Sequence, residues 1–130
     1  MTDFNWLSHE LVRQIHDEQL AEHGGLPGIR DQNALDATLA RPEQKHYYQP
    51  ASSVFELAAS YAYGFARNHP FSDGNKRTAL LAAYVFLADN GWELDADEDA
   101  ARDTFLDLAA GNLSEEALAE WLEQESIPFE

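Results

Sequence analysis

Apolar residues recur at helical spacing through most of this 130-residue chain. Leu7, Leu11 and Ile15 follow one another every four residues, so they share one face of a helix that Ser8 can cap. Gly24, the first of two glycines, ends this stretch, because glycine readily adopts the left-handed conformation at a helix end. The pattern therefore predicts a first amphipathic helix between Ser8 and Gly24.

A second, shorter helix is expected after Asp31, which can cap it. Pro42 is expected to end it, because proline lacks the amide hydrogen and its ring clashes with the preceding turn. The segment 43–49 shows no helical pattern, so we expect a loop or a short hairpin there. Tyr47 and Tyr48 belong to this segment.

Two central helices are predicted next. Ser53 and Glu56 form a capping box, and this helix ends before Pro70, because a residue that precedes proline avoids the helical conformation. A second helix over residues 76–89 closes at Asn90. Both are apolar on nearly all sides, which is typical of buried helices.

Two amphipathic helices follow, Glu98–Ala110 and Glu115–Gln124. We therefore expect an all-α, compact orthogonal bundle of about six helices that forms one domain over residues 1–130. Apolar residues make up 45% of the chain and charged residues 25%, which is ordinary for a folded globular protein. The chain contains no cysteine, which excludes disulfides, thiolate metal sites and a cysteine nucleophile.

The chain is strongly acidic, with 24 acidic and 8 basic side chains and a net charge of −16. Residues 93–130 hold 13 of the acids and only one base, Arg102, and the simplest interpretation is a solvated helical surface. Such a protein is repelled by phosphate backbones, so we expect no direct binding to nucleic acid. There is no apolar run long enough for a membrane span and no basic leader, so we expect a cytoplasmic protein without membrane contact.

The charge reverses in the segment that joins the two central helices, residues 69–77, which reads His-Pro-Phe-Ser-Asp-Gly-Asn-Lys-Arg. A helix N-terminus presents unpaired amides and a partial positive charge, and thus a site for an anion. Gly74 lets the backbone approach a ligand closely. Lys76 and Arg77 have the unfavourable sign for this end of a helix, and a bound polyphosphate would remove the conflict.

Two further side chains of this segment suit the same chemistry. Asp73 is a natural ligand for a Mg²⁺ ion that a polyphosphate carries, and His69 can accept a proton near neutral pH. The alternative is structural: Asp73, Gly74 and Asn75 would cap a helix, and His69 would be a buried histidine with satisfied hydrogen bonds. Each residue alone favours this alternative, whereas the complete set favours an active site. Phe71 is expected to anchor the loop in the core.

The same residues resemble the signature of the Fic/Doc (Fido) superfamily, His-x-Phe-x-Asp/Glu-Gly-Asn-x-Arg, and every specified position is filled here. Within it the chain resembles the death-on-curing (Doc) toxin branch, in which the usual glycine before the arginine is lysine, here Lys76. Segments 24–42 and 86–91 also resemble Doc proteins, so the resemblance spans nearly the whole chain. It implies the Fido fold.

The resemblance implies a role for each matching residue. His69 would deprotonate a target hydroxyl, and Asp73 would hold Mg²⁺. The implied contacts to the phosphates of ATP are Gly74, Asn75, Lys76, Arg77 and, two residues before the histidine, Arg67. Arg67 is equally consistent with an ordinary surface arginine.

Two positions bear on which group is transferred. In Fic proteins that transfer AMP, glycine stands at the position of Lys76 and a second arginine commonly at that of Leu80. The lysine fills space that the α-phosphate needs, and the missing arginine removes a clamp, so the γ-phosphoryl group is expected to face the acceptor. Resemblance to Doc toxins thus implies phosphorylation of a threonine on a translation factor such as elongation factor Tu, which blocks translation. The alternatives are AMP transfer to a protein hydroxyl and a non-catalytic nucleotide-binding module.

The resemblance also implies partners. In the family, a flap that pairs with the target backbone falls at residues 43–49, so Tyr47 and Tyr48 are candidate target contacts, or ordinary loop aromatics that cover the core. Fic proteins are often held inactive by a helix with the pattern Ser/Thr-x-x-x-Glu-Gly/Asn, which residues 52–56 match only in part. We therefore expect a separate antitoxin whose disordered segment folds onto the active-site groove.

Overall fold

The computed structural model describes residues 3–129, and within them it contains six helices and one two-stranded sheet. The elements are α1 (His9–His23), α2 (Gln32–Tyr48), α3 (Val54–Asn68), α4 (Asn75–Asp89), β1 (Trp92–Leu94), α5 (Glu98–Ala110), α6 (Glu115–Gln124) and β2 (Ser126–Pro128). The expected all-α fold of about six helices is confirmed. The sheet was not predicted, because three-residue strands carry too little pattern to recognise.

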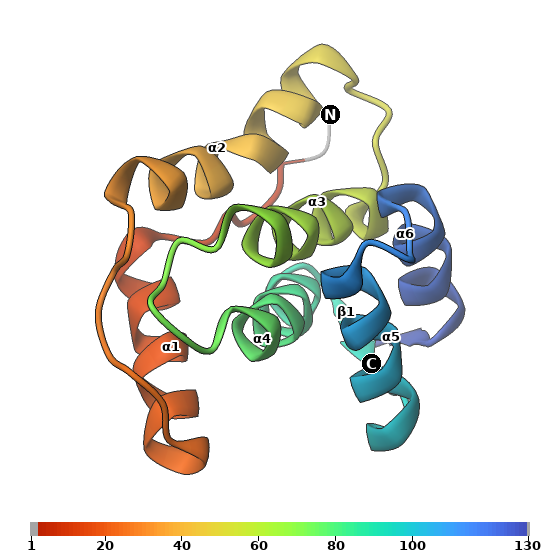
Figure 1. Ribbon diagram of the computed structural model, residues 1–130. Helices are drawn as coiled ribbons and strands as arrows, with labels where there is room; N and C mark the ends of the chain where they lie inside the picture. The colour runs from red at the N-terminus through yellow and green to blue at the C-terminus, as the bar shows by residue number, and fades with distance from the viewer. Residues whose placement is uncertain (1–2, 130) are drawn as a thin grey trace.

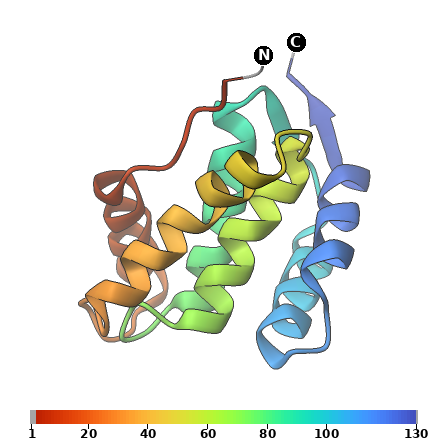
Figure 2. The same cartoon turned by 90° about the horizontal axis from the view of Figure 1, so that it is seen from above.

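Helix α3 lies at the centre of the molecule and contacts α2, α4, α5 and α6. In Figure 1, α2 lies above it and α4 below it, and Figure 2 shows α1 on the opposite side of this central group from α5 and α6. Eleven of its 15 residues are buried, which confirms that this apolar helix belongs to the core. The site described below is built on the two helices that pack most closely together, α3 and α4.

Side chains cap the N-termini of five of the six helices in residues 3–129. Ser53 and Glu56 form the expected capping box at the start of α3, so the partial match to an inhibitory helix at 52–56 is a cap. The residues that cap α1, α2, α5 and α6 are Ser8, Asp31, Asp97 and Ser114. Helix α4 is preceded by Gly74, and no side chain in residues 3–129 caps its N-terminus with a hydrogen bond. Its first amides therefore lack the partner that the other helices provide.

The expected end of α2 at Pro42 is wrong, and so is the loop or hairpin at 43–49, because the helix continues through Tyr48. A proline inside a helix costs about 3 kcal/mol. Pro42 is itself buried, on the same face as Leu35 and Leu39, so the cost is offset by packing against α3. Tertiary contacts thus override the local signal.

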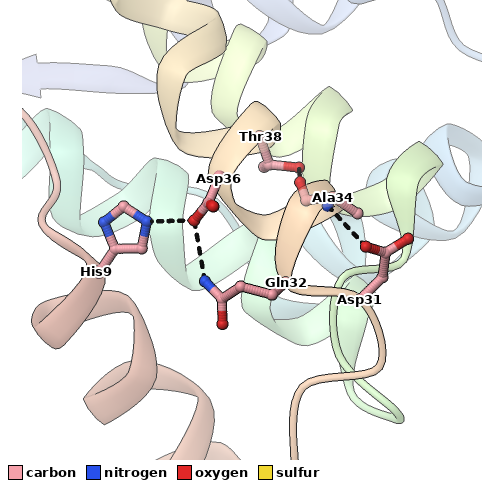
Figure 3. Close-up of polar contacts among 6 residues, drawn as sticks. All are labelled: His9, Asp31, Gln32, Ala34, Asp36 and Thr38. Atoms are coloured by element: carbon pink, nitrogen blue, oxygen red, sulfur yellow. Dashed lines mark hydrogen bonds and ion pairs between the residues drawn. The ribbon is translucent and has the colours of Figure 1, made fainter.

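A polar contact joins α1 to α2 on the surface (Figure 3). The Asp36 carboxylate accepts a hydrogen bond from Gln32 Nε2 (2.9 Å) in its own helix and lies 2.8 Å from His9 Nε2 in α1. The hydrogen bonds with Gln32 and His9 lower the pKa of Asp36. His9 is a surface residue.

The C-terminal part of the chain closes with β1 and β2, which pair antiparallel with Glu93 opposite Ile127. The acidic side chains Glu98, Asp99, Asp103 and Asp107 of α5 are exposed, which agrees with a solvated acidic surface. None of the helices in residues 3–129 combines the length and apolar composition needed to cross a bilayer.

Candidate active site

A loop of six residues, 69–74, joins the C-terminus of α3 to the N-terminus of α4 (Figure 1). The segment between α1 and α2, residues 24–31, runs beside it, and Ile29 pairs with Phe71 in an isolated antiparallel bridge. We call residues 24–31 the connecting segment. Two parts of the chain about 40 residues apart therefore build one site.

Phe71 anchors the middle of the loop in the core, as expected. Its side chain is 1% exposed and stacks on the buried His16 of α1, with ring centroids 3.8 Å apart. His16 Nε2 also donates a hydrogen bond to the carbonyl oxygen of Asp73 (2.8 Å). His16 lies one turn from the buried Val12, on the apolar face of α1.

Asn75 holds the loop through its side chain. Its Oδ1 accepts a hydrogen bond from the amide of Phe71 (3.1 Å), and its Nδ2 donates one to the carbonyl of the same residue (3.0 Å). Both ends of the amide side chain are therefore occupied within the loop. What Asn75 offers to a ligand is its backbone amide in the first turn of α4.

The N-terminus of α4 carries two exposed cations, Lys76 and Arg77. Within residues 3–129, neither forms an ion pair with a carboxylate. Gly74, which precedes them, is in the left-handed conformation with φ 77°. Uncapped amides, the positive end of the helix dipole and two cations without an ion pair in residues 3–129 are together suited to a multiply charged anion.

Asp73 lies exposed beside this anion site. Its Oδ1 accepts a hydrogen bond from the amide of Gly74 (2.9 Å), and its Oδ2 accepts a longer one from the amide of Leu26 in the connecting segment (3.3 Å). No group of three or more histidine and acidic side chains in the described residues could hold a metal ion by itself. A single exposed carboxylate next to a phosphate site fits Mg²⁺ that arrives with a nucleotide, because Mg²⁺ is commonly held by one or two carboxylates and by phosphates.

His69 begins the loop and has an exposed side chain. Its backbone is left-handed, with φ 46° and ψ 58°, and it is the one residue other than glycine with positive φ among residues 3–129. This conformation costs about 1–3 kcal/mol and persists only where the surroundings hold it, and such strain often occurs at functional sites. The imidazole of His69 is therefore accessible to solvent, while the backbone of this residue is held in a strained conformation.

Arg67 lies on the last turn of α3, with its guanidinium 5.7 Å from the centre of the Tyr63 ring. It lines a pocket of about 510 Å³ between α2, α3 and the α5–α6 connection. Arg41 lies on the same tyrosine ring at 4.9 Å and lines the same pocket. Arg67 thus lines a cavity to which neither the loop 69–74 nor the first turn of α4 contributes a residue.

Tyr47 and Tyr48 lie at the end of α2, where 76% and 79% of their side chains are exposed. Their rings contact edge to face, with centroids 5.0 Å apart. Because this segment is helical, its backbone amides are committed to the helix, and the expected strand-like pairing with a target is not available in this conformation. Their exposure excludes the alternative that they cover the core.

Sequence analysis missed three residues that support the loop: His16, Gln19 and Arg30. Gln19 is 2% exposed, and its side chain lies against Gly74. Arg30 donates to backbone carbonyls at the end of α3. The only feature of the sequence that could have indicated this role is that positions 16 and 19 adjoin the apolar face of α1. No pattern around Arg30 indicates its contact with the loop.

The loop lies within the part of the chain that matches a known protein family. The model of the Fic/DOC family matches residues 6–87. "Protein kinase doc" of Escherichia phage P1 is 34% identical over 116 residues, which covers 89% of this chain and 91% of the relative. "Toxin Doc" of Mycolicibacterium smegmatis (strain ATCC 700084 / mc(2)155) is 41% identical over 103 residues, which covers 70% of this chain and 79% of the relative.

Proposed function

The chain belongs to the Fic/DOC family, and on this premise we propose that it transfers the γ-phosphoryl group of ATP to a protein hydroxyl as the toxin of a toxin–antitoxin pair. Support comes from relatives named as a protein kinase and a toxin, which align over most of the chain. The uncapped N-terminus of α4, with exposed and unpaired Lys76 and Arg77, is the structural observation that carries the proposal.

The proposed roles follow from the positions of the side chains. His69 accepts the proton of the acceptor hydroxyl, whose oxygen forms a bond to the γ-phosphorus, and the bond from that phosphorus to the β–γ bridging oxygen breaks, so that ADP leaves. Lys76, Arg77 and the first amides of α4, from Asn75 onward, bind the phosphates and stabilise the developing charge. Gly74, whose own amide is bonded to Asp73, lets the backbone approach the phosphates closely. Mg²⁺, when bound with ATP, would be held by Asp73 and would neutralise phosphate charge.

The choice of the γ-phosphoryl group rests on two positions in α4. Lys76 places a long cationic side chain in the first turn, and Leu80 is packed against the core where a second arginine would serve AMP transfer. We propose that the triphosphate is therefore positioned with its terminal group toward the acceptor. Arg67, in the neighbouring pocket, is proposed as a further phosphate contact.

The proposed target is a translation factor such as elongation factor Tu, modified on a threonine in the cytoplasm. Tyr47 and Tyr48 are proposed as target contacts through their exposed side chains. The site is open, since His69 and Asp73 are exposed, so restraint is proposed to come from a separate antitoxin with a disordered segment that covers the loop.

Incubation with Mg²⁺, elongation factor Tu and ATP labelled in the γ- or α-phosphate tests the reaction. We expect γ-label on the target and a loss of at least about 100-fold in the His69→Ala variant, because the general base is removed. His9→Ala, which removes another exposed histidine, is the matched control and should retain activity.

Transfer of α-label instead would replace the proposal by AMP transfer. Binding of ATP in calorimetry without transfer to any protein of a cell extract would favour a non-catalytic nucleotide-binding module. Expression without an antitoxin should arrest growth for the wild type and not for His69→Ala, and unaffected growth with the wild type would contradict the toxin role.

A further inference from the structure

The connecting segment holds the loop through backbone hydrogen bonds along its length. The amides of Arg30 and Asp31 both donate to the carbonyl of Pro70, at 2.8 and 3.1 Å. The amide of Ser72 donates to the carbonyl of Gly28 (3.1 Å). These bonds fix the path of the loop and do not depend on side chains.

The side chain of Arg30 adds a contact of another kind. Its Nε donates to the carbonyl of His69 (2.6 Å), and its Nη2 donates to the carbonyl of Asn68 (2.9 Å). These carbonyls end α3, where no further helical amide can pair with them. A guanidinium suits this place, because it offers two donors in a fixed plane and a positive charge at the negative end of the helix dipole.

Pro70, which follows His69, explains why a side chain from another segment bonds to the carbonyls at this end of α3. A left-handed residue at a helix end is normally followed by an amide that bonds back to the last turn. Here the next residue is Pro70, which has no amide hydrogen, so that bond cannot form. The Arg30 side chain bonds instead to the carbonyls of Asn68 and His69, at the turn where that amide hydrogen is missing.

The other parts of the loop have anchors of their own. Phe71 is held by Asn75 and by the core, and Asp73 by His16 and Gly74. The carbonyl of His69 has Arg30 as its side-chain partner in the described residues. A change at Arg30 should therefore act on His69 and leave the phosphate site at α4 in place.

We propose that Arg30 is a positioning residue: by capping α3, it holds His69 in the left-handed conformation that sets the direction of the imidazole toward the acceptor hydroxyl. This inference rests on the proposed role of His69 as the proton acceptor. Arg30 acts through the backbone of His69 and makes no contact with nucleotide or target.

The test compares Arg30→Ala with Arg30→Lys, with Arg102→Ala, an exposed arginine of α5, as the matched control. For Arg30→Ala we expect a fall in kcat of about 10- to 100-fold, because the base is misplaced. We also expect a Kd for ATP within about twofold of the wild type, because the anion site at α4 is separate. Arg30→Lys keeps the positive charge but lacks the planar pair of donors, so its kcat should lie between those of the wild type and Arg30→Ala.

A second measurement follows the backbone directly. The NMR Cα and Cβ chemical shifts of His69 should move away from left-handed values in Arg30→Ala and remain unchanged in Arg102→Ala. Unchanged shifts together with wild-type kcat would overturn the inference, as would an equal loss of ATP binding and activity. If the wild type transfers no phosphate, the proposed function fails, and the chemical shifts still show whether Arg30 holds His69. If Arg30→Ala does not fold, Arg30→Lys provides the same comparison.

Discussion

Single residues of the loop are constrained by neighbours that lie far away in the sequence. A Cβ atom on Gly74 would clash with Gln19 Nε2, in a position with φ 77°. Gln19 is buried, and within residues 3–129 neither polar atom of its side chain has a hydrogen-bond partner. Both the backbone conformation and the amide packed against it thus favour glycine at position 74.

We expect Gly74→Ala to lower the free energy of unfolding by about 1–3 kcal/mol, from left-handed strain and overpacking. Gln19→Ala removes the obstructing amide and two unsatisfied polar atoms, so the double variant should lose about 1 kcal/mol less than the sum of the single changes. Urea denaturation of the wild type, the two single variants and the double variant measures this coupling. Strictly additive losses would show that Gln19 does not restrict position 74.

At the scale of elements, the starts of helices depend on nearby residues, whereas the contacts between helices depend on residues far apart in the sequence. The caps at Ser8, Asp31 and Ser53 are local and agree with the sequence pattern. The course of α2 through Pro42 depends on burial against α3, and the contact of α2 with α1 depends on Asp36 and its partners.

The contact at Asp36 should contribute a pH-dependent part to stability. Hydrogen bonds with Gln32 and His9, and the nearby charges of His9 and Arg13, lower the pKa of Asp36 from its ordinary value of 3.8. Because the folded-state pKa is the lower one, the contribution is complete above the unfolded pKa and is lost as pH falls through the folded pKa.

We therefore expect Asp36→Asn to have a slightly lower Tm than the wild type at about pH 6, and the difference to shrink as pH falls through the folded-state pKa of Asp36. Thermal denaturation followed by circular dichroism measures both. The effect should be small, because the carboxylate is exposed. A difference that grows toward acid would contradict the assigned direction.

At the scale of the whole molecule, one ion pair joins the N-terminal and C-terminal parts around α3. Arg41 of α2 binds both carboxylate oxygens of Glu115 in α6, at 2.6 and 2.9 Å, and also donates to the Ser60 hydroxyl of α3 (2.8 Å). The hydrogen bonds that Arg41 donates to the Glu115 carboxylate raise the pKa of Arg41. Glu115 has a side chain that is only 16% exposed, so this one acid of the C-terminal part is structural.

We expect Glu115→Gln to lower the free energy of unfolding by about 1–2 kcal/mol, because a charge-assisted pair becomes a neutral contact while Arg41 stays partly buried. Glu116→Gln, an exposed neighbour, is the matched control and should change stability by less than about 0.5 kcal/mol. Equal effects of the two substitutions in urea denaturation would mean that the pair does not stabilise the fold.

The sequence by itself determined the helices and the place of the candidate site. Caps and apolar faces are local patterns, and His69, Asp73, Lys76 and Arg77 lie within nine residues, so neither needs long-range information. Only the tertiary structure decided that α2 passes Pro42 and that His16, Gln19 and Arg30 support the loop. The physical reason is that packing and hydrogen bonds between distant segments depend on how the chain folds back on itself, which no spacing along the chain records.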